Sequence, residues 1–189
     1  VPNEPHLLVS AGWDRVVRFW DTRRGEAIRT IPECHVCGDA LDVLGDELLV
    51  GAFASPQAPV RVYDVRSGVP LADAAWEKAG GATRTGTGTG GGGGSGGCKV
   101  YAAQFSHAAA GLVAAAGVGA VDGQGELRIF RRDGLRPIGR APAARGVTAL
   151  DVTSAVGKLQ PGEIGCRVAT VSGVTVSVYE VREPTQDLN

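Results

Sequence analysis

The sequence predicts an all-β protein built from repeated antiparallel sheets of about four short strands each. Segments such as VRFWD, VRVYD and VTVSVYEV alternate apolar and polar residues, which is the pattern of a strand with one buried face. Helical periodicity is convincing nowhere in the 189 residues. Four segments, at 18–25, 61–68, 127–134 and 176–183, share an aromatic residue followed by a polar one, and this recurrence indicates a repeated unit.

The strands expected from these patterns fall into four consecutive groups. In chain order they lie at 7–11, 16–21 and 27–31; at 40–44, 47–53, 60–65 and, more weakly, 69–74; at 100–105, 112–116, 126–131 and 136–139; and at 147–152, 167–171 and 174–181. The first group lacks an innermost strand and the last lacks an outermost one. The expected content is therefore about 3.5 four-stranded units.

The clearest unit is the stretch 7–23, which has the pattern of a β-hairpin: two apolar strands flank a turn rich in Gly and Asp. Within it, Ser10, Asp14 and Trp20 lie at offsets of four and six residues. This spacing resembles a repeat of the WD-repeat β-propeller family. The resemblance implies that the serine hydroxyl, the turn carboxylate and the indole N–H join in a hydrogen-bond network that locks the hairpin.

The repeat length agrees with this resemblance. The aromatic residues Trp20, Tyr63, Phe130 and Tyr179 are separated by 43, 67 and 49 residues, whereas a WD blade repeats at about 40–45 residues. The long second interval contains a Gly/Thr/Ser-rich tract, which is expected to be a flexible insertion.

The resemblance implies blades arranged radially, and we expect the chain to be the C-terminal portion of a seven-bladed propeller. The alternative is that these residues are the whole product and hide their open sheet edges by self-association. The expected boundaries are blades at 1–76, the Gly-rich insertion at 77–98, further blades at 99–182 and a C-terminal tail at 183–189.

Composition argues against several classes of function. A net charge of −1 without a basic stripe does not favour nucleic acid. No signal peptide and no apolar run of about 20 residues is evident, so no membrane association is expected. Four cysteines in such a chain are expected to be reduced thiols in the cytosol. We expect a cytoplasmic protein, with the cilium or cytoskeleton as the alternative locations.

Catalytic and cofactor motifs are not supported either. The Gly-rich tract lacks the Gly-Lys-Ser/Thr ending of a phosphate-binding loop, and no nucleophile has a base nearby in a known motif. Cys34 and Cys37 have the C-x-x-C spacing of a zinc site but lack a matching second pair. We therefore expect no enzyme activity, no small-molecule substrate, no cofactor and no bound metal, and whether these two cysteines hold zinc is left open.

The residues with binding character are Trp13, Arg15, Arg23 and Arg66. Trp13 precedes the turn aspartate, a position that in the family faces a surface where partners dock, and aromatic and Arg side chains dominate interface hot spots. The alternative is that Trp13 packs against a neighbouring blade or against the missing half of the propeller.

The predicted function is a non-catalytic scaffold that binds other proteins in a multi-subunit assembly, with cytoskeletal or ciliary assemblies as candidates. The segments W-D-x-R (20–23) and Y-D-x-R (63–66) also resemble the DWD box of substrate receptors for cullin–RING ubiquitin ligases. This second resemblance gives an alternative function, in which Arg23 and Arg66 help to dock the ligase adaptor. Burial of these arginines in ion pairs within a blade would weaken it.

Overall fold

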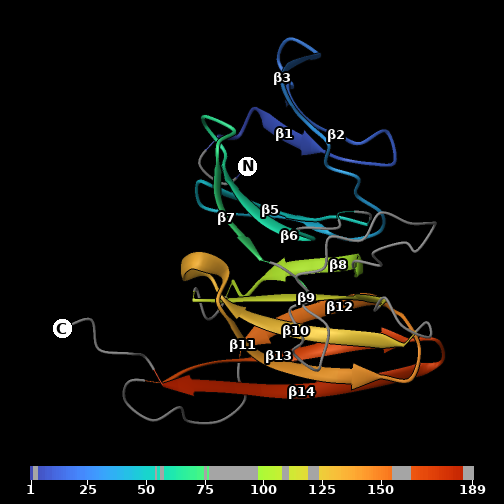
Figure 1. Ribbon diagram of the computed structural model, residues 1–189. Coiled ribbons are helices and arrows are strands. Elements are labelled where there is room, and N and C mark those ends of the chain that lie inside the picture. The colour runs from blue at the N-terminus through green and yellow to red at the C-terminus, as the bar shows by residue number, and fades with distance from the viewer. Residues whose placement is uncertain are drawn as a thin grey trace, which may run out of the picture.

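The computed structural model describes residues 1, 4–53, 55, 58–74, 76, 98–107, 111–118, 124–154 and 163–184. These residues form four antiparallel sheets, which we call blades 1 to 4 in chain order, with successive blades stacked face to face (Figure 1). The all-β prediction is confirmed, and every predicted strand is present within a few residues of its expected limits.

The strands follow one another without crossover inside each blade. Blade 1 contains β1 (Leu7–Ser10), β2 (Val16–Asp21) and β3 (Glu26–Pro32), and blade 2 contains β4 (Leu41–Leu44), β5 (Glu47–Gly51), β6 (Val60–Asp64) and β7 (Pro70–Ala74). Blade 3 contains β8 (Lys99–Phe105), β9 (Leu112–Val118), β10 (Gly125–Arg131) and β11 (Pro137–Ala143), and blade 4 contains β12 (Val147–Ser154), β13 (Glu163–Ser172) and β14 (Thr175–Pro184).

The described blades therefore hold three, four, four and three strands, as the sequence predicts for a partial propeller. The expected total of seven blades stays a prediction. Two details differ from the expectation: a single turn of 3-10 helix, η1 (Asp133–Leu135), joins β10 to β11, and β14 continues to Pro184, two residues into the predicted tail. The predicted insertion at 77–98 lies outside the described residues except for Cys98, which is buried.

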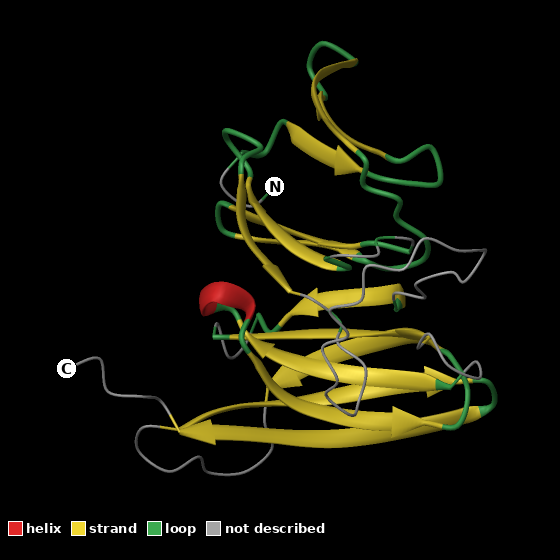
Figure 2. Ribbon diagram, in the orientation of Figure 1, coloured by secondary structure: helices red, strands yellow, loops and turns green. Residues whose placement is uncertain are grey.

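Short turns join several neighbouring strand pairs within a blade, among them β2–β3, β4–β5 and β13–β14 (Figure 2). The β4–β5 and β13–β14 connections each have two residues and contain a glycine with a positive φ, Gly45 at 62° and Gly173 at 61°. A two-residue hairpin loop needs positive φ values, and glycine adopts them without a steric penalty. The sequence therefore fixes the register of these hairpins locally.

The core lies between the blades, because each sheet buries apolar side chains against its neighbour. One cluster joins blades 1, 2 and 3 and includes Phe19, Leu48, Val62, Phe105 and Phe130. A second joins blades 3 and 4 and includes Leu112, Ile129, Leu150, Val168 and Cys166. The connections between strands lie at the two ends of the blades, and the binding candidates Trp13, Arg15, Arg23 and Arg66 lie on these connections.

Candidate functional site

The β1–β2 hairpin contains only part of the network that the family resemblance implies. The indole Nε1 of Trp20 donates a hydrogen bond of 2.8 Å to the Ser10 hydroxyl. The Asp14 carboxylate instead accepts hydrogen bonds from Arg18 and from the backbone amide of Val16. Asp14 lies in an exposed turn, where the nearby guanidinium of Arg18 binds its carboxylate and lowers its pKa. The structure thus separates Asp14 from the Ser10–Trp20 pair.

Trp13 lies in the same turn and belongs to a group of aromatic rings in edge-to-face or tilted contact. Its indole centroid is 5.0 Å from the ring of His35 and 5.4 Å from the ring of Phe53, and Phe53 is 5.3 Å from Tyr101. We call these four residues the aromatic cluster. The ammonium of Lys99 lies 5.2 Å from the Phe53 ring centroid, within range of a cation–π contact.

Three blades contribute to the aromatic cluster. Trp13 comes from the β1–β2 turn, His35 from the connection between β3 and β4, Phe53 from the segment after β5, and Tyr101 from β8. Backbone hydrogen bonds hold the pieces together: the Phe53 amide donates to the His35 carbonyl at 2.7 Å, and the Val36 amide donates to the Gly12 carbonyl at 3.2 Å. The cluster is therefore a preformed surface at one end of the blades.

The exposure of the cluster is uneven. Trp13 is 66% exposed, so much of its indole faces solvent. The two ring nitrogens of His35 are buried without a hydrogen-bond partner among the described residues, so this side chain serves here as an aromatic platform. Arg15 is exposed beside Trp13, and its positive φ of 64° turns the chain there. Apolar area next to a cation is typical of protein-binding surfaces.

The sequence pointed to Trp13 and Arg15 but missed Phe53, Tyr101 and Lys99 as members of this surface. A signal for Phe53 was present, since Phe53 follows β5 as closely as Trp13 follows β1. Equivalent turns of neighbouring blades lie side by side, so aromatic residues in both turns are expected to meet.

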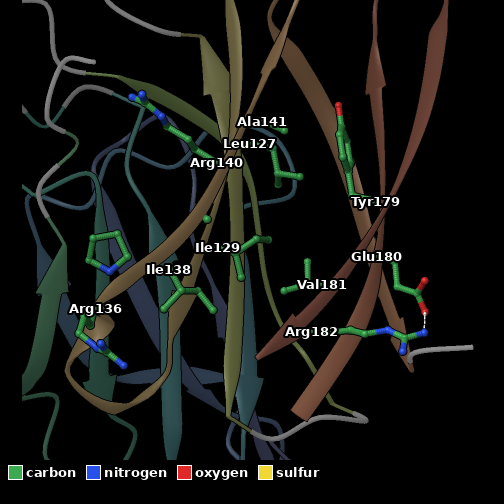
Figure 3. Close-up of a pocket in the computed structure, with 12 residues that line it drawn as sticks. Leu127, Ile129, Arg136, Ile138, Arg140, Ala141, Tyr179, Glu180, Val181 and Arg182 are labelled. Carbon is green, nitrogen blue, oxygen red and sulfur yellow. Dashed lines mark hydrogen bonds and ion pairs between the residues drawn. The ribbon is translucent and has the colours of Figure 1, made fainter. Parts of the chain in front are cut away.

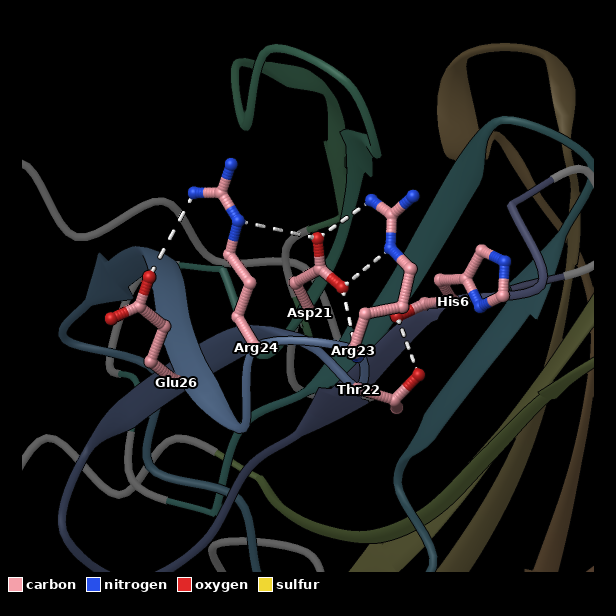
Figure 4. Close-up of polar contacts among 6 residues, drawn as sticks. All are labelled: His6, Asp21, Thr22, Arg23, Arg24 and Glu26. Carbon is pink, nitrogen blue, oxygen red and sulfur yellow. Dashed lines mark hydrogen bonds and ion pairs between the residues drawn. The ribbon is translucent and has the colours of Figure 1, made fainter.

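At the opposite end of the blades, Asp21 organises the β2–β3 turn (Figure 4). Its carboxylate accepts two hydrogen bonds from the Arg23 guanidinium, at 2.7 and 3.0 Å, and one from the Arg23 amide at 3.0 Å. These bonds hold the pKa of Asp21 far below its usual value. Thr22 in the same turn donates its hydroxyl and its amide to the His6 carbonyl.

Arg66 occupies the equivalent turn of blade 2 and lies 3.6 Å from Asp46 of the same blade. Both Arg23 and Arg66 are paired within their own blades, yet each side chain stays about two-thirds exposed. Between the two turns lies a pocket of about 420 Å³, in which Arg29 donates to the carbonyls of Val65 and Arg66. The arginines are thus ion-paired but accessible.

A third feature is a groove of about 510 Å³ between β11 and β14 (Figure 3). Leu127, Ile129, Ile138 and Val181 contribute apolar surface to it. Charged side chains, including Arg136, Arg140, Glu180 and Arg182, also line it, and Arg182 donates to Glu180 at 3.0 Å. The groove lies beside β14, the last strand in the sheet order of blade 4.

Cys34 is buried, with its sulfur 3.4 Å from the Tyr63 hydroxyl, and burial raises the pKa of its thiol. Cys37 is partly exposed. Within the described ranges, no group of three or more His, Cys, Asp or Glu side chains is arranged to hold a metal ion. No helix in the described part of the chain is long and apolar enough to cross a bilayer.

Comparison with known proteins gives relatives at the level of sequence and of fold. No protein-family model matches the chain. The target of rapamycin complex subunit LST8 of Saccharomyces cerevisiae is 38% identical over 71 residues, which cover 38% of this chain and 23% of that protein. The match thus spans less than a quarter of that relative's length.

Solved structures resemble nearly the whole chain. The computationally designed Ika4 protein superposes with a TM-score of 0.59 and 17% identity, covering 93% of this chain and 86% of that one. The WD40 domain of Toxoplasma gondii coronin gives a TM-score of 0.55 and 17% identity, covering 91% of this chain and 41% of that one. Together with the stacked antiparallel blades of three or four strands, these likenesses show that the chain has the fold of a WD40 β-propeller, and the local match makes 71 of its residues similar in sequence to the yeast subunit.

Proposed function

We propose that this protein is a non-catalytic scaffold that binds a protein partner through the aromatic cluster. The observation that carries the proposal is Trp13, whose large indole is 66% exposed while its inner side rests on His35 and Phe53. A rigid aromatic side chain that already stands on a packed base loses little conformational entropy on binding. Trp is also among the residues most enriched in interface hot spots.

Two further observations support a protein partner. The cluster is held by backbone hydrogen bonds between blades, so the surface is formed before any partner arrives. The relative with the local sequence match is itself named as a subunit of a complex.

We keep the cytoplasm as the proposed location, with cytoskeletal or ciliary assemblies as the alternatives, and imaging of the tagged endogenous protein tests this.

The test is affinity purification of the tagged protein from its native source, with co-purifying proteins quantified by mass spectrometry. Trp13→Ala is compared with Val69→Ala, a control at an exposed valine in the opposite end of blade 2. A hot-spot Trp is worth about 2 kcal/mol, so Trp13→Ala should weaken the main partner about 30-fold, whereas Val69→Ala should retain it. Equal recovery with both variants would refute docking at the cluster.

The substrate-receptor function is the second candidate, because Arg23 and Arg66 remain about two-thirds exposed despite their ion pairs. An exposed Arg offers a planar fork of donors to carboxylates or carbonyls of an adaptor. In the same purification, this function predicts a cullin–RING adaptor that is lost in an Arg23→Glu, Arg66→Glu double variant and kept in Trp13→Ala. Absence of any such adaptor from the unmodified sample would exclude it.

A further inference from the structure

The aromatic cluster also indicates what kind of segment it binds, an inference that rests on the docking function proposed above. Each of its four side chains keeps part of its surface exposed. The rings of Trp13, Phe53 and Tyr101 follow one another at centroid distances of 5.4 and 5.3 Å, and neighbouring rings are inclined by 45° and 81°. The cluster therefore presents a short row of three inclined rings rather than one flat platform.

Two polar groups on these rings are available to a partner. The indole N–H of Trp13 and the hydroxyl of Tyr101 form no hydrogen bond with the described residues. By contrast, the indole N–H groups of Trp20 and Trp76 both donate to side chains within the chain, at 2.8 and 2.9 Å. In the described part of the chain, Trp13 is thus the one tryptophan whose N–H is left for a partner.

These features distinguish between the common modes of peptide recognition. Addition of a β-strand needs a free backbone edge, and an amphipathic helix needs an apolar groove several turns long, whereas the cluster offers a short row of side chains. A segment in the polyproline II conformation has no internal hydrogen bonds, so its carbonyls are free to accept, and its proline rings pack on aromatic side chains. One turn of three residues advances about 9 Å, which suits a row of three rings.

Positive charge flanks the row. The ammonium of Lys99 lies 5.2 Å from the centroid of the central ring, and Arg15 is exposed two residues after Trp13. Neither cation has an ion pair with the described residues, whereas Asp14, the acid in the same turn, is already bound by Arg18. Two unpaired cations favour a partner that carries acidic residues next to the segment on the rings.

We propose that the partner docks on the aromatic cluster through a proline-rich segment in the polyproline II conformation, with acidic residues beside the prolines. The proline rings pack on Trp13, Phe53 and Tyr101, and carbonyls of the segment accept hydrogen bonds from the Trp13 indole and the Tyr101 hydroxyl. The acidic side chains pair with Arg15 and Lys99. Such a segment is largely fixed in conformation before it binds, so little entropy is lost on either side of the contact.

Fluorescence anisotropy with a labelled synthetic peptide tests the proposal on the 189-residue chain. The probe is decaproline followed by two glutamates, and the control peptide has alternating glycine and serine in place of the prolines. We expect the probe to bind saturably and the flexible control to bind about 10-fold more weakly or not at all. Equal binding of the two peptides, or a dissociation constant of the probe above about 1 mM, would overturn the proposal.

Variants of the protein separate the contacts. Trp13→Ala should weaken the probe about 30-fold, whereas Val69→Ala, at an exposed valine outside the cluster, should leave its affinity unchanged. Tyr101→Phe keeps the ring and removes only the hydroxyl, so it should weaken the probe about 5-fold. Lys99→Gln should weaken the probe about 3-fold and leave decaproline without glutamates unaffected.

Circular dichroism should show that all these variants keep their β-structure. An affinity unchanged in Trp13→Ala would overturn docking of the probe on the cluster. An affinity unchanged in both Tyr101→Phe and Lys99→Gln would overturn the polar contacts assigned to the segment.

The affinity purification described above separates failure of this inference from failure of the docking function. Recovery of a partner that depends on Trp13 but lacks a proline-rich segment, together with failure of the probe, would overturn only the kind of segment. Equal recovery of all partners with Trp13→Ala and Val69→Ala would overturn docking at the cluster itself.

Discussion

The Ser10–Trp20 hydrogen bond allows a quantitative test of how the first hairpin is held together. The perturbation is a double-mutant cycle of Ser10→Ala and Trp20→Phe. The bond is 2.8 Å long and joins two neutral, partly buried groups. The net contribution of such a bond to folding is about 0.5–1.5 kcal/mol, so we expect a coupling energy of about 1 kcal/mol between the two positions.

The assay is urea unfolding of the four proteins of the cycle, monitored by circular dichroism and extrapolated linearly to water. Loss of indole packing in Trp20→Phe appears in both the single and the double variant and therefore cancels. In thermal unfolding, the coupling corresponds to a shift of about 2–4 °C for a chain of this size.

The matched control is a second cycle, of Asp14→Asn and Trp20→Phe. Because Asp14 binds Arg18 and the Val16 amide, its coupling to Trp20 should stay within about 0.5 kcal/mol of zero. A Ser10–Trp20 coupling near zero would refute the hydrogen bond. A large Asp14–Trp20 coupling would instead support the three-membered network that the family resemblance implies.

Three further results are expected. Asp21→Asn should flatten the acid side of the stability–pH curve, because a carboxyl whose pKa is lowered on folding stabilises the protein above its unfolded pKa of 3.8 and loses this effect as the pH falls toward its folded pKa. Urea midpoints measured from pH 2 to 7 test this, and a slope unchanged by the substitution would contradict it. Burial and a nearby carboxylate raise the pKa of Cys98 to about 12, so iodoacetamide at pH 8 should label the partly exposed Cys37 before it labels Cys98. Peptide mass spectrometry measures the two labelling rates, and equal rates at Cys37 and Cys98 would contradict this. Gly117→Ala should lower the free energy of unfolding by about 1–3 kcal/mol in urea unfolding, because the new Cβ would lie 2.0 Å from the Lys99 carbonyl oxygen. Gly139→Ala, whose new Cβ would have its nearest atom at 3.9 Å, is the matched control, and equal losses of stability in the two variants would contradict the close approach at Gly117.

The local patterns of the sequence determined the strands, because alternation of apolar and polar residues and glycine-containing turns act over only a few positions. The pairs Val17/Phe19 and Val176/Val178 have the same pattern, and both were correctly predicted to lie in strands. The order of strands within each blade followed as well, since short connections join antiparallel neighbours.

The tertiary structure alone decided what those side chains contact. Val17 and Phe19 are buried because blade 2 lies on them, whereas the identically patterned Val176 and Val178 are exposed on the last described sheet. The aromatic cluster likewise joins Trp13 to Phe53 and Tyr101, which are far apart in the chain. Periodicity indicates which side of a strand is apolar, but contacts between blades depend on distances in space that no local pattern contains. The aromatic cluster therefore forms only when the blades stack.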